Sequence, residues 1–227
     1  MSLRAIVFDF DGVIANSEPL HFQGFRDVAA EEGVTLTEPD YYARYLGFDD
    51  VGAFEAMGAD QGVVWTREQI QALVTRKAVK LEVLERGVSV LFPGAADAIR
   101  RAAAAMPIAI ASGARGEEIR RVLKRENLIT CFAAIVAAED TPASKPAPDP
   151  YLHALALLAR SFGNRLNPAE CVAIEDSRWG LDAARAAGLR TVAVTNSYPA
   201  AELEADLTIA SLEAMDLDRL AFLCTNP

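Results

Sequence analysis

The sequence predicts an α/β fold in which a doubly wound parallel sheet carries an inserted all-helical domain. Two observations predict it. From residue 92 onward, short apolar runs alternate with helical patterns, which is typical of a parallel sheet covered by helices on both faces. About 100 residues separate the first buried strand from the next, whereas a single parallel crossover needs only about a dozen. The intervening segment therefore forms a unit of its own.

The first element is a buried strand over Ala5–Phe8 that ends in acidic residues. Its apolar run stops at Asp9, and Asp11 and Gly12 follow. Ligands of open α/β sheets bind at the carboxyl ends of strands. Two carboxylates at such an end repel each other unless a cation or a proton intervenes. On its own the pattern is also compatible with an ordinary solvated turn.

The inserted segment is helical in pattern. Ser17 is a candidate N-cap for a helix over Glu18–Glu32, and a second long helix is expected over Glu68–Arg86. Shorter helical pieces are expected near Pro39–Tyr45 and Asp50–Met57. We therefore expect a helical domain over residues 16–91, and a core domain formed by residues 1–15 and 92–227.

The rest of the chain alternates helix and strand. The expected helices cover residues 95–105, 116–126, 149–162 and 178–187, and the expected strands cover residues 107–111, 133–136, 171–174, 191–194 and 207–209. Right-handed crossovers bring the carboxyl ends of these strands to one edge of the sheet.

Composition restricts the function classes. The net charge of −10 argues against nucleic acid and anionic membranes as partners, because both need basic surfaces. The three widely spaced cysteines fit neither a disulfide framework nor a zinc site, and no apolar run approaches the length of a membrane span. We expect a cytoplasmic enzyme that acts on a small molecule. The sequence is compatible with a monomeric protein.

Polar groups follow four of the expected core elements, and a parallel sheet brings them to one crevice. They are Asp9 and Asp11, Ser112 and Gly113, Lys145, and Glu175 with Asp176. Carboxylates and water suit octahedral Mg²⁺. A carboxylate can attack phosphorus, a lysine and a cation can neutralise the phosphoryl charge, and a second carboxyl can move the proton. Each of these residues could also have a purely structural role, such as helix capping by Ser112 or Asp176.

Four segments together resemble the motifs of the haloacid dehalogenase superfamily, in the subgroup that includes phosphoglycolate phosphatase and β-phosphoglucomutase. They are residues 9–13, Ser112-Gly113, residues 145–149 and residues 175–177. The resemblance covers nearly the whole chain and implies a Rossmann-like core with a helical cap domain that closes over the active site.

By this resemblance, Asp9 is the nucleophile and Asp11 the general acid and base. Ser112, Gly113 and Lys145 would bind phosphate. The Mg²⁺ ligands would be Asp9, the Asp11 carbonyl, Glu175 and Asp176. Dehalogenase members lack the second aspartate of the first motif, so Asp11 implies phosphoryl transfer. The expected function is Mg²⁺-dependent hydrolysis of a small phosphate monoester, such as a sugar phosphate or phosphoglycolate, through a phosphoaspartyl intermediate.

Three residues of the helical segment are candidate substrate contacts, namely His21, Arg44 and Lys77. Packing within the cap is an equal alternative for His21, and solvated surface is the simpler interpretation of Arg44 and Lys77.

Two other functions remain as alternatives. One is a hexose-phosphate mutase. β-Phosphoglucomutases carry an arginine that grips the second phosphate, and the corresponding stretch here, Gly47-Phe48-Asp49-Asp50, has an acid at that position. The other is a non-catalytic binding module, which loss of a motif carboxylate would indicate, and none is lost. A nucleotide-dependent dehydrogenase is excluded because no Gly-x-Gly-x-x-Gly follows the first strand.

Overall fold

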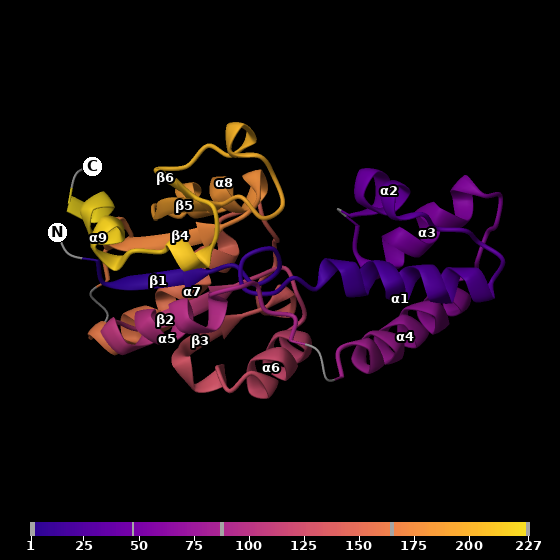
Figure 1. Ribbon diagram of the computed structural model, residues 1–227, viewed down its shortest axis with the longest axis horizontal. Coiled ribbons are helices and arrows are strands. Elements are labelled where there is room, and N and C mark those ends of the chain that lie inside the picture. The colour runs from indigo at the N-terminus through magenta and orange to yellow at the C-terminus, as the bar shows by residue number, and fades with distance from the viewer. Residues whose placement is uncertain (1–2, 47, 87–88, 164–165, 226–227) are drawn as a thin grey trace. The chain divides into compact units, whose positions relative to one another are not determined.

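The structure is a computed structural model and describes residues 3–46, 48–86, 89–163 and 166–225. Contacts between residues divide the chain into two units (Figure 1). One, here called the core unit, contains the chain up to Asn16 and from Val90 onward. The other, the helical unit, is Ser17–Ser89. Each is described by itself.

The core unit is built on a six-stranded, entirely parallel sheet with the order β3-β2-β1-β4-β5-β6. The strands are β1 Ala5–Phe8, β2 Ile108–Ala111, β3 Phe132–Val136, β4 Cys171–Glu175, β5 Arg190–Val194 and β6 Leu207–Ile209. This topology confirms the predicted doubly wound sheet. β2 begins at Ile108 and not at Pro107, in keeping with the missing N–H of proline.

Helices connect these strands. They are α5 Ala95–Ala105, α6 Gly116–Arg125, α7 Asp149–Ala159, α8 Arg178–Ala186 and α9 Leu217–Thr225. The helix expected over residues 149–162 ends at Ala159 and tightens into a 3₁₀ turn over Arg160–Phe162. Helix α9 was not predicted from the sequence.

One face of the sheet is packed against α7 and α8. Alternate strand residues such as Val7, Ala109 and Ala173 lie fully buried in one cluster with Tyr151 of α7 and Ala183 of α8. The period of two along each strand is what places these residues on the same face. Most of the buried residues in this cluster are alanines.

The helical unit contains α1 Glu18–Glu31, α2 Glu38–Asp40, a π-helical turn Tyr41–Tyr45, α3 Asp50–Asp60 and α4 Arg67–Leu84. The single helix expected over Pro39–Tyr45 is thus two short pieces. Ser17 is at the N-cap of α1, but its side chain makes no capping hydrogen bond. Thr66 and Gln69 form the capping box that begins α4.

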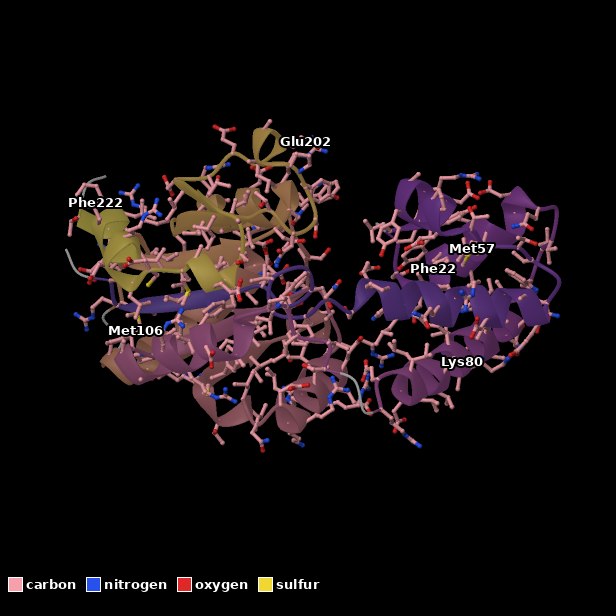
Figure 2. The ribbon with its side chains drawn as sticks, viewed as in Figure 1. Phe22, Met57, Lys80, Met106, Glu202 and Phe222 are labelled. Atoms are coloured by element: carbon pink, nitrogen blue, oxygen red, sulfur yellow. The ribbon has the colours of Figure 1, made fainter. Side chains whose placement is uncertain are left out.

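An aromatic core holds the helical unit together. Phe22 and Met57, which Figure 2 labels, are buried together with Phe25 and Phe54. The rings of Phe25 and Phe54 meet edge to face with centroids 5.1 Å apart, an arrangement that adds to the gain from burial. The unit therefore has its own hydrophobic core, as an independently packed domain requires.

The chain leaves and re-enters the core unit through two paired segments. Ala15 and Leu91 form an antiparallel bridge, Asn16 donates its N–H to the Val90 carbonyl at 2.6 Å, and Phe92 donates to Ile14 at 3.0 Å. Both ends of the insertion are thus anchored directly after the β1 loop. Among the described residues, no helix is both long and apolar enough to span a membrane.

Candidate active site

The candidate site lies at the carboxyl ends of β1 and β4. The strand order reverses between these two neighbours, and such reversal points are where open α/β sheets bind ligands. Phe8 pairs with Ile174, and the Asp9 N–H donates to the Ile174 carbonyl at 2.9 Å. The ladder between the strands therefore continues into the first acidic residue and places Asp9 beside Glu175.

Asp9 is almost completely buried, and its two oxygens differ. Oδ1 accepts the Phe10 N–H at 2.7 Å and lies 2.9 Å from Lys145 Nζ. Oδ2 accepts no hydrogen bond from the described residues. One oxygen is therefore held by the protein, and the other is available for chemistry.

Glu175 is fully buried, and both of its oxygens are engaged. Oε1 accepts from Lys145 and from the Tyr151 hydroxyl, each at 2.6 Å. Oε2 accepts from the Asp176 N–H at 3.2 Å and from Ser177 Oγ at 3.3 Å. Burial and the nearby charge of Asp9 raise the pKa of this carboxyl. Glu175 therefore orders its neighbours by accepting from four donors.

Asp176 is buried but less engaged than Glu175. Its Oδ2 accepts a short hydrogen bond from the Ser197 hydroxyl, and its Oδ1 accepts none from the described residues. Burial, followed by the charges of Asp9 and Glu175, raises the pKa of Asp176 to about 8. The site thus concentrates negative charge that a proton or a cation must balance.

Lys145 is the cation at the centre of this cluster. Burial disfavours its charge, but the carboxylates of Asp9 and Glu175 outweigh burial and raise the pKa of Lys145 well above its usual range. Its ammonium also lies 5.3 Å from the centre of the Tyr151 ring. Lys145 is therefore charged and bridges the nucleophile candidate to Glu175.

Two glycines allow the close approach of these carboxylates. Gly12 has φ +75°, and a β-carbon there would lie 1.9 Å from Asp176 Oδ2. A β-carbon on Gly180, in the first turn of α8, would lie about 2 Å from the Glu175 carboxylate atoms. Any larger residue at either position would displace an acidic group of the site.

Ser112 and Gly113 follow β2 at the same edge. Ser112 is buried, donates its N–H to the Val136 carbonyl, and accepts the Ala114 N–H on its Oγ at 3.0 Å. Gly113 is exposed. The first N–H of α6, on Gly116, is bound by Glu139 at 3.0 Å. The helix end itself is therefore occupied by a carboxylate, which leaves the Ser112-Gly113 turn as the expected anion contact.

Asp11 lies in the loop after β1, partly exposed, and forms an isolated parallel bridge with Ala15. The loop folds back because Ile14 and Ala15 both donate to the Phe10 carbonyl, at 2.8 and 2.9 Å. Asp11 thus follows Asp9 on a tightly turned segment.

The donor set fits a divalent cation. Asp9, Glu175 and Asp176 each offer a carboxylate oxygen, and these oxygens lie within 4.8 Å of one another. All three residues are buried, and two of them have raised pKa values. Because Glu175 already accepts from four protein donors, Asp176 is the less engaged of the two adjacent carboxylates.

Sequence reasoning missed three residues of this site. Tyr151 donates to Glu175, Ser197 donates to Asp176, and Asn196 Nδ2 donates to the Gly12 carbonyl at 2.8 Å. Tyr151 lies two residues after Asp149, so its position just beyond the third motif was a usable signal. Asn196 and Ser197 follow β5 and belong to none of the recognised motifs.

The three candidates in the helical unit have structural partners there. Lys77 is only 1% exposed, so its interpretation as solvated surface is wrong. Its ammonium lies 2.6 Å from Asp50 Oδ1 and 2.9 Å from His21 Nδ1. Arg44 is exposed and pairs with Asp60. These contacts show how the three side chains are held and do not assign them a substrate.

The acidic pair of the possible mutase signature is also accounted for locally. Asp49 caps α3 by accepting the Gly52 N–H at 2.7 Å, and Asp50 pairs with Lys77. Phe48 is exposed, and Gly47 lies outside the described residues. The Asp50 charge is therefore balanced and does not stand alone.

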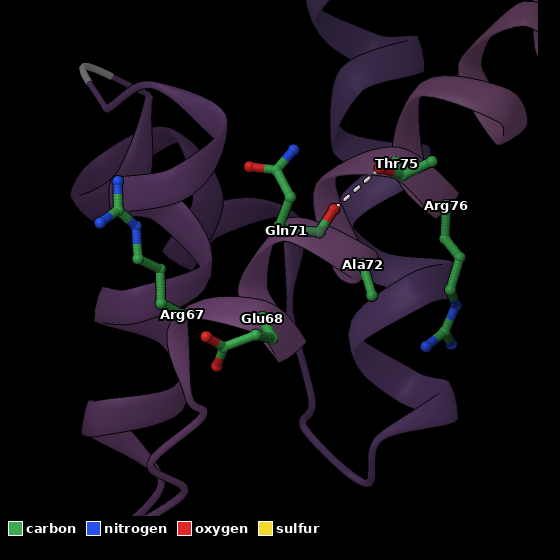
Figure 3. Close-up of a pocket in the computed structure, with 6 residues that line it drawn as sticks. All are labelled: Arg67, Glu68, Gln71, Ala72, Thr75 and Arg76. Carbon is green, nitrogen blue, oxygen red and sulfur yellow. Dashed lines mark hydrogen bonds between the residues drawn. The ribbon is translucent and has the colours of Figure 1, made fainter.

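A shallow hollow along α4 contains none of the candidate site residues. It is lined by Arg67, Glu68, Gln71, Ala72, Thr75 and Arg76, all from one helix (Figure 3). Arg76 forms ion pairs with Glu31 and Glu32 of the α1 end. The hollow has no grouping of catalytic side chains.

Comparison with known proteins identifies the family. The model of the haloacid dehalogenase-like hydrolase family matches residues 6–194. Protein CbbY of Rhodobacter capsulatus is 33% identical over 97% of this chain and 96% of its own length. Hexitol phosphatase B of Escherichia coli K12 is 30% identical over 96% and 94%, and beta-phosphoglucomutase of Bacillus subtilis is 28% identical over 96% and 94%. The chain therefore belongs to the haloacid dehalogenase-like hydrolase family.

Proposed function

We propose that this hydrolase removes phosphate from a small phosphorylated metabolite, with Asp9 as the nucleophile. The observation that carries the proposal is the state of Asp9. Lys145 and the Phe10 N–H fix its Oδ1, while Oδ2 accepts no hydrogen bond from the described residues. A carboxylate oriented in this way is ready to attack an electrophile without first breaking a hydrogen bond.

The first step is attack of Asp9 Oδ2 on phosphorus. The bond from phosphorus to the leaving oxygen breaks, and an aspartyl phosphate forms. Lys145 lies 2.9 Å from the other Asp9 oxygen, where its positive charge offsets the approach of an anionic nucleophile to an anionic phosphate. Ser112 and the Gly113 N–H are the proposed contacts for the phosphoryl oxygens.

Asp11 is proposed to move the protons. As a neutral acid it donates a proton to the departing alkoxide. The resulting carboxylate then removes a proton from water, which attacks the aspartyl phosphate, releases inorganic phosphate and regenerates Asp9. Its position two residues after Asp9 on a tight loop supports this role.

Asp9, Asp176 and the Asp11 carbonyl are the proposed direct ligands of Mg²⁺, with Glu175 behind them. The supporting observation is the buried acidic cluster. When bound, the ion supplies charge neutralisation for phosphoryl oxygens. Glu175 orients Lys145 and the start of α8 through its four hydrogen bonds.

The helical unit is proposed to act as the cap that selects the leaving group, and the core unit to perform the chemistry. Sugar phosphates and sugar-alcohol phosphates are the proposed substrate class, since relatives of similar length carry hexitol phosphatase and phosphoglucomutase names. A cytoplasmic location is part of the same proposal.

The test combines a substrate screen with trapping. Phosphate release is measured over sugar phosphates, hexitol phosphates, phosphoglycolate and nucleotides, with Mg²⁺ and with EDTA. We expect release from a sugar or hexitol phosphate with Mg²⁺, and a loss of at least about 100-fold in Asp9→Asn. Acid quench with labelled substrate should give protein-bound phosphate in the wild type and none in Asp9→Asn. Equal labelling of both proteins contradicts Asp9 as the nucleophile.

A further inference from the structure

The loop that follows β5 touches both acidic loops of the candidate site. Three consecutive residues of this loop make contacts there or with the start of α8. Asn196 Nδ2 donates to the Gly12 carbonyl at 2.8 Å, the Ser197 hydroxyl donates to Asp176 Oδ2, and the Tyr198 ring packs edge to face on Trp179 of α8 with centroids 6.4 Å apart. We call residues 196–198 the β5 brace. No recognised motif includes it.

We propose that the β5 brace positions the metal-binding carboxylate of Asp176, with Ser197 as the residue that acts on it directly. This inference rests on the proposed function, because Asp176 is there assigned to the metal. Ser197 takes up Oδ2 of Asp176, and Oδ1 accepts no hydrogen bond from the described residues. The hydroxyl therefore selects which oxygen faces a cation and restricts rotation of the carboxylate.

The packing around Gly12 makes this position sensitive. A β-carbon on Gly12 would lie 1.9 Å from Asp176 Oδ2 and 2.9 Å from Ser197 Oγ. The Gly12 backbone, the carboxylate and the hydroxyl are thus in mutual contact. Because Asn196 holds the Gly12 carbonyl, the brace fixes both sides of the Asp176 carboxylate.

Outer residues of this kind matter because they orient metal ligands, and their loss commonly weakens metal binding 10- to 100-fold. Ser197 itself is exposed, whereas Asp176 is buried. Water can reach the serine position more easily than the carboxylate that it holds. We therefore expect the loss of Ser197 to weaken Mg²⁺ binding by about 10-fold, at the lower end of this range.

The experiment measures Mg²⁺ binding to the substrate-free protein by titration calorimetry, alongside the Mg²⁺ dependence of turnover. The variants are Ser197→Ala, Ser197→Thr and Asn196→Ala. Thr195→Ala is the matched control, since Thr195 lies on the same loop and its hydroxyl points to the Ala210 carbonyl at 3.5 Å. Asp176→Asn reports on the metal site itself.

We expect Ser197→Ala to weaken Mg²⁺ binding to the substrate-free protein about 10-fold and to raise the Mg²⁺ midpoint of turnover by a similar factor. Ser197→Thr should restore binding, and Thr195→Ala should match wild type. Wild-type affinity in Ser197→Ala, or tighter binding because the hydroxyl competes with the ion, overturns the proposal. If Asp176→Asn also leaves Mg²⁺ binding intact, the metal assignment within the proposed function fails as well.

Discussion

Glu175 and Asp176 are adjacent in sequence but differ in how much of their hydrogen-bonding capacity the protein uses. Glu175 accepts from Lys145, Tyr151, Ser177 and the backbone, whereas Asp176 Oδ1 accepts no hydrogen bond from the part of the chain that the structure describes. We predict that Asp176→Ala weakens the Mg²⁺ dependence of turnover far more than Glu175→Ala. Glu175→Ala should instead lower the free energy of unfolding by about 3–5 kcal/mol, because it leaves buried donors without an acceptor and removes one of the two carboxylates that balance the Lys145 ammonium.

Divalent titrations of activity and urea unfolding separate these two effects. Equal Mg²⁺ midpoints for wild type and both variants contradict the assignment of Asp176. Unchanged unfolding of Glu175→Ala contradicts the structural role of Glu175.

The raised pKa of Asp176, about 8 instead of its ordinary value of 3.8, makes stability depend on pH. Between these values the folded metal-free protein binds more protons than the unfolded chain, so its stability falls as pH rises from about 4 to about 8. Glu175 acts in the same direction because its pKa is also raised. Mg²⁺ competes with protons for these oxygens.

We therefore predict that the Tm in EDTA decreases from pH 6 to pH 8, and that the rise in Tm on adding Mg²⁺ is larger at pH 8 than at pH 6. Calorimetry of wild type and Asp176→Asn tests this, with the variant expected to show a smaller pH slope. A metal-free Tm that rises over this interval contradicts the account.

The start of α8 shows how a single element fixes the position of the site. Gly180 lies in its first turn, where Ser177 Oγ accepts the Gly180 N–H at 3.2 Å. Replacing glycine by alanine within a helix usually stabilises it by about 1 kcal/mol. Here a β-carbon would lie about 2 Å from the Glu175 carboxylate, so the helix or the carboxylate has to move.

We predict that Gly180→Ala destabilises the protein by about 1–3 kcal/mol and reduces phosphatase activity. Gly24→Ala in α1 is the matched control, because the nearest atom to its β-carbon is Lys77 Cγ at 3.4 Å, an ordinary contact. Urea unfolding and turnover are measured for both. If Gly180→Ala is as stable and as active as Gly24→Ala, the close approach of Gly180 to the Glu175 carboxylate is contradicted.

The elements that are best predicted from the sequence are those whose formation depends on their own residues and the turns beside them. The buried strands of the core are short apolar runs flanked by turns, and their alternation with helices specifies the parallel sheet. A helical piece was expected near Pro39–Tyr45, but the π-helical form of Tyr41–Tyr45 was not, and the C-terminal helix α9 was not predicted. Aromatic packing in the first case and contact with β4 in the second depend on residues distant in the sequence.

The same distinction applies to the site. Asp9, Lys145, Glu175 and Asp176 are recognisable because each follows a core element, and the structure brings them together. Ser197 was not recognisable, because its role depends on a side chain 21 residues away on a neighbouring strand end. The burial of Lys77 was missed for a similar reason, since its partners Asp50 and His21 come from other helices.

At the scale of the whole molecule, the question is whether phosphate is released or returned to the substrate. A mutase has to retain a bisphosphate while it turns around, which requires a cation for the second phosphate. The stretch expected to supply one holds the acidic pair Asp49-Asp50, and the Asp50 carboxylate lies 2.6 Å from Lys77. The helical unit therefore presents a neutral ion pair at this position. A phosphate facing this pair gains little attraction and loses its hydration.

We predict net hydrolysis, with no efficient interconversion of β-glucose 1-phosphate and glucose 6-phosphate. The enzyme is mixed with Mg²⁺, β-glucose 1-phosphate and a trace of the 1,6-bisphosphate, and glucose 6-phosphate and free phosphate are followed together. Hydrolysis needs only one phosphate bound in the core unit, because water completes the cycle through Asp11. Bisphosphate added in excess should likewise be hydrolysed and not retained. Glucose 6-phosphate formed at tens of turnovers per second, typical of an efficient enzyme, with little phosphate released, establishes a mutase and rejects the phosphatase.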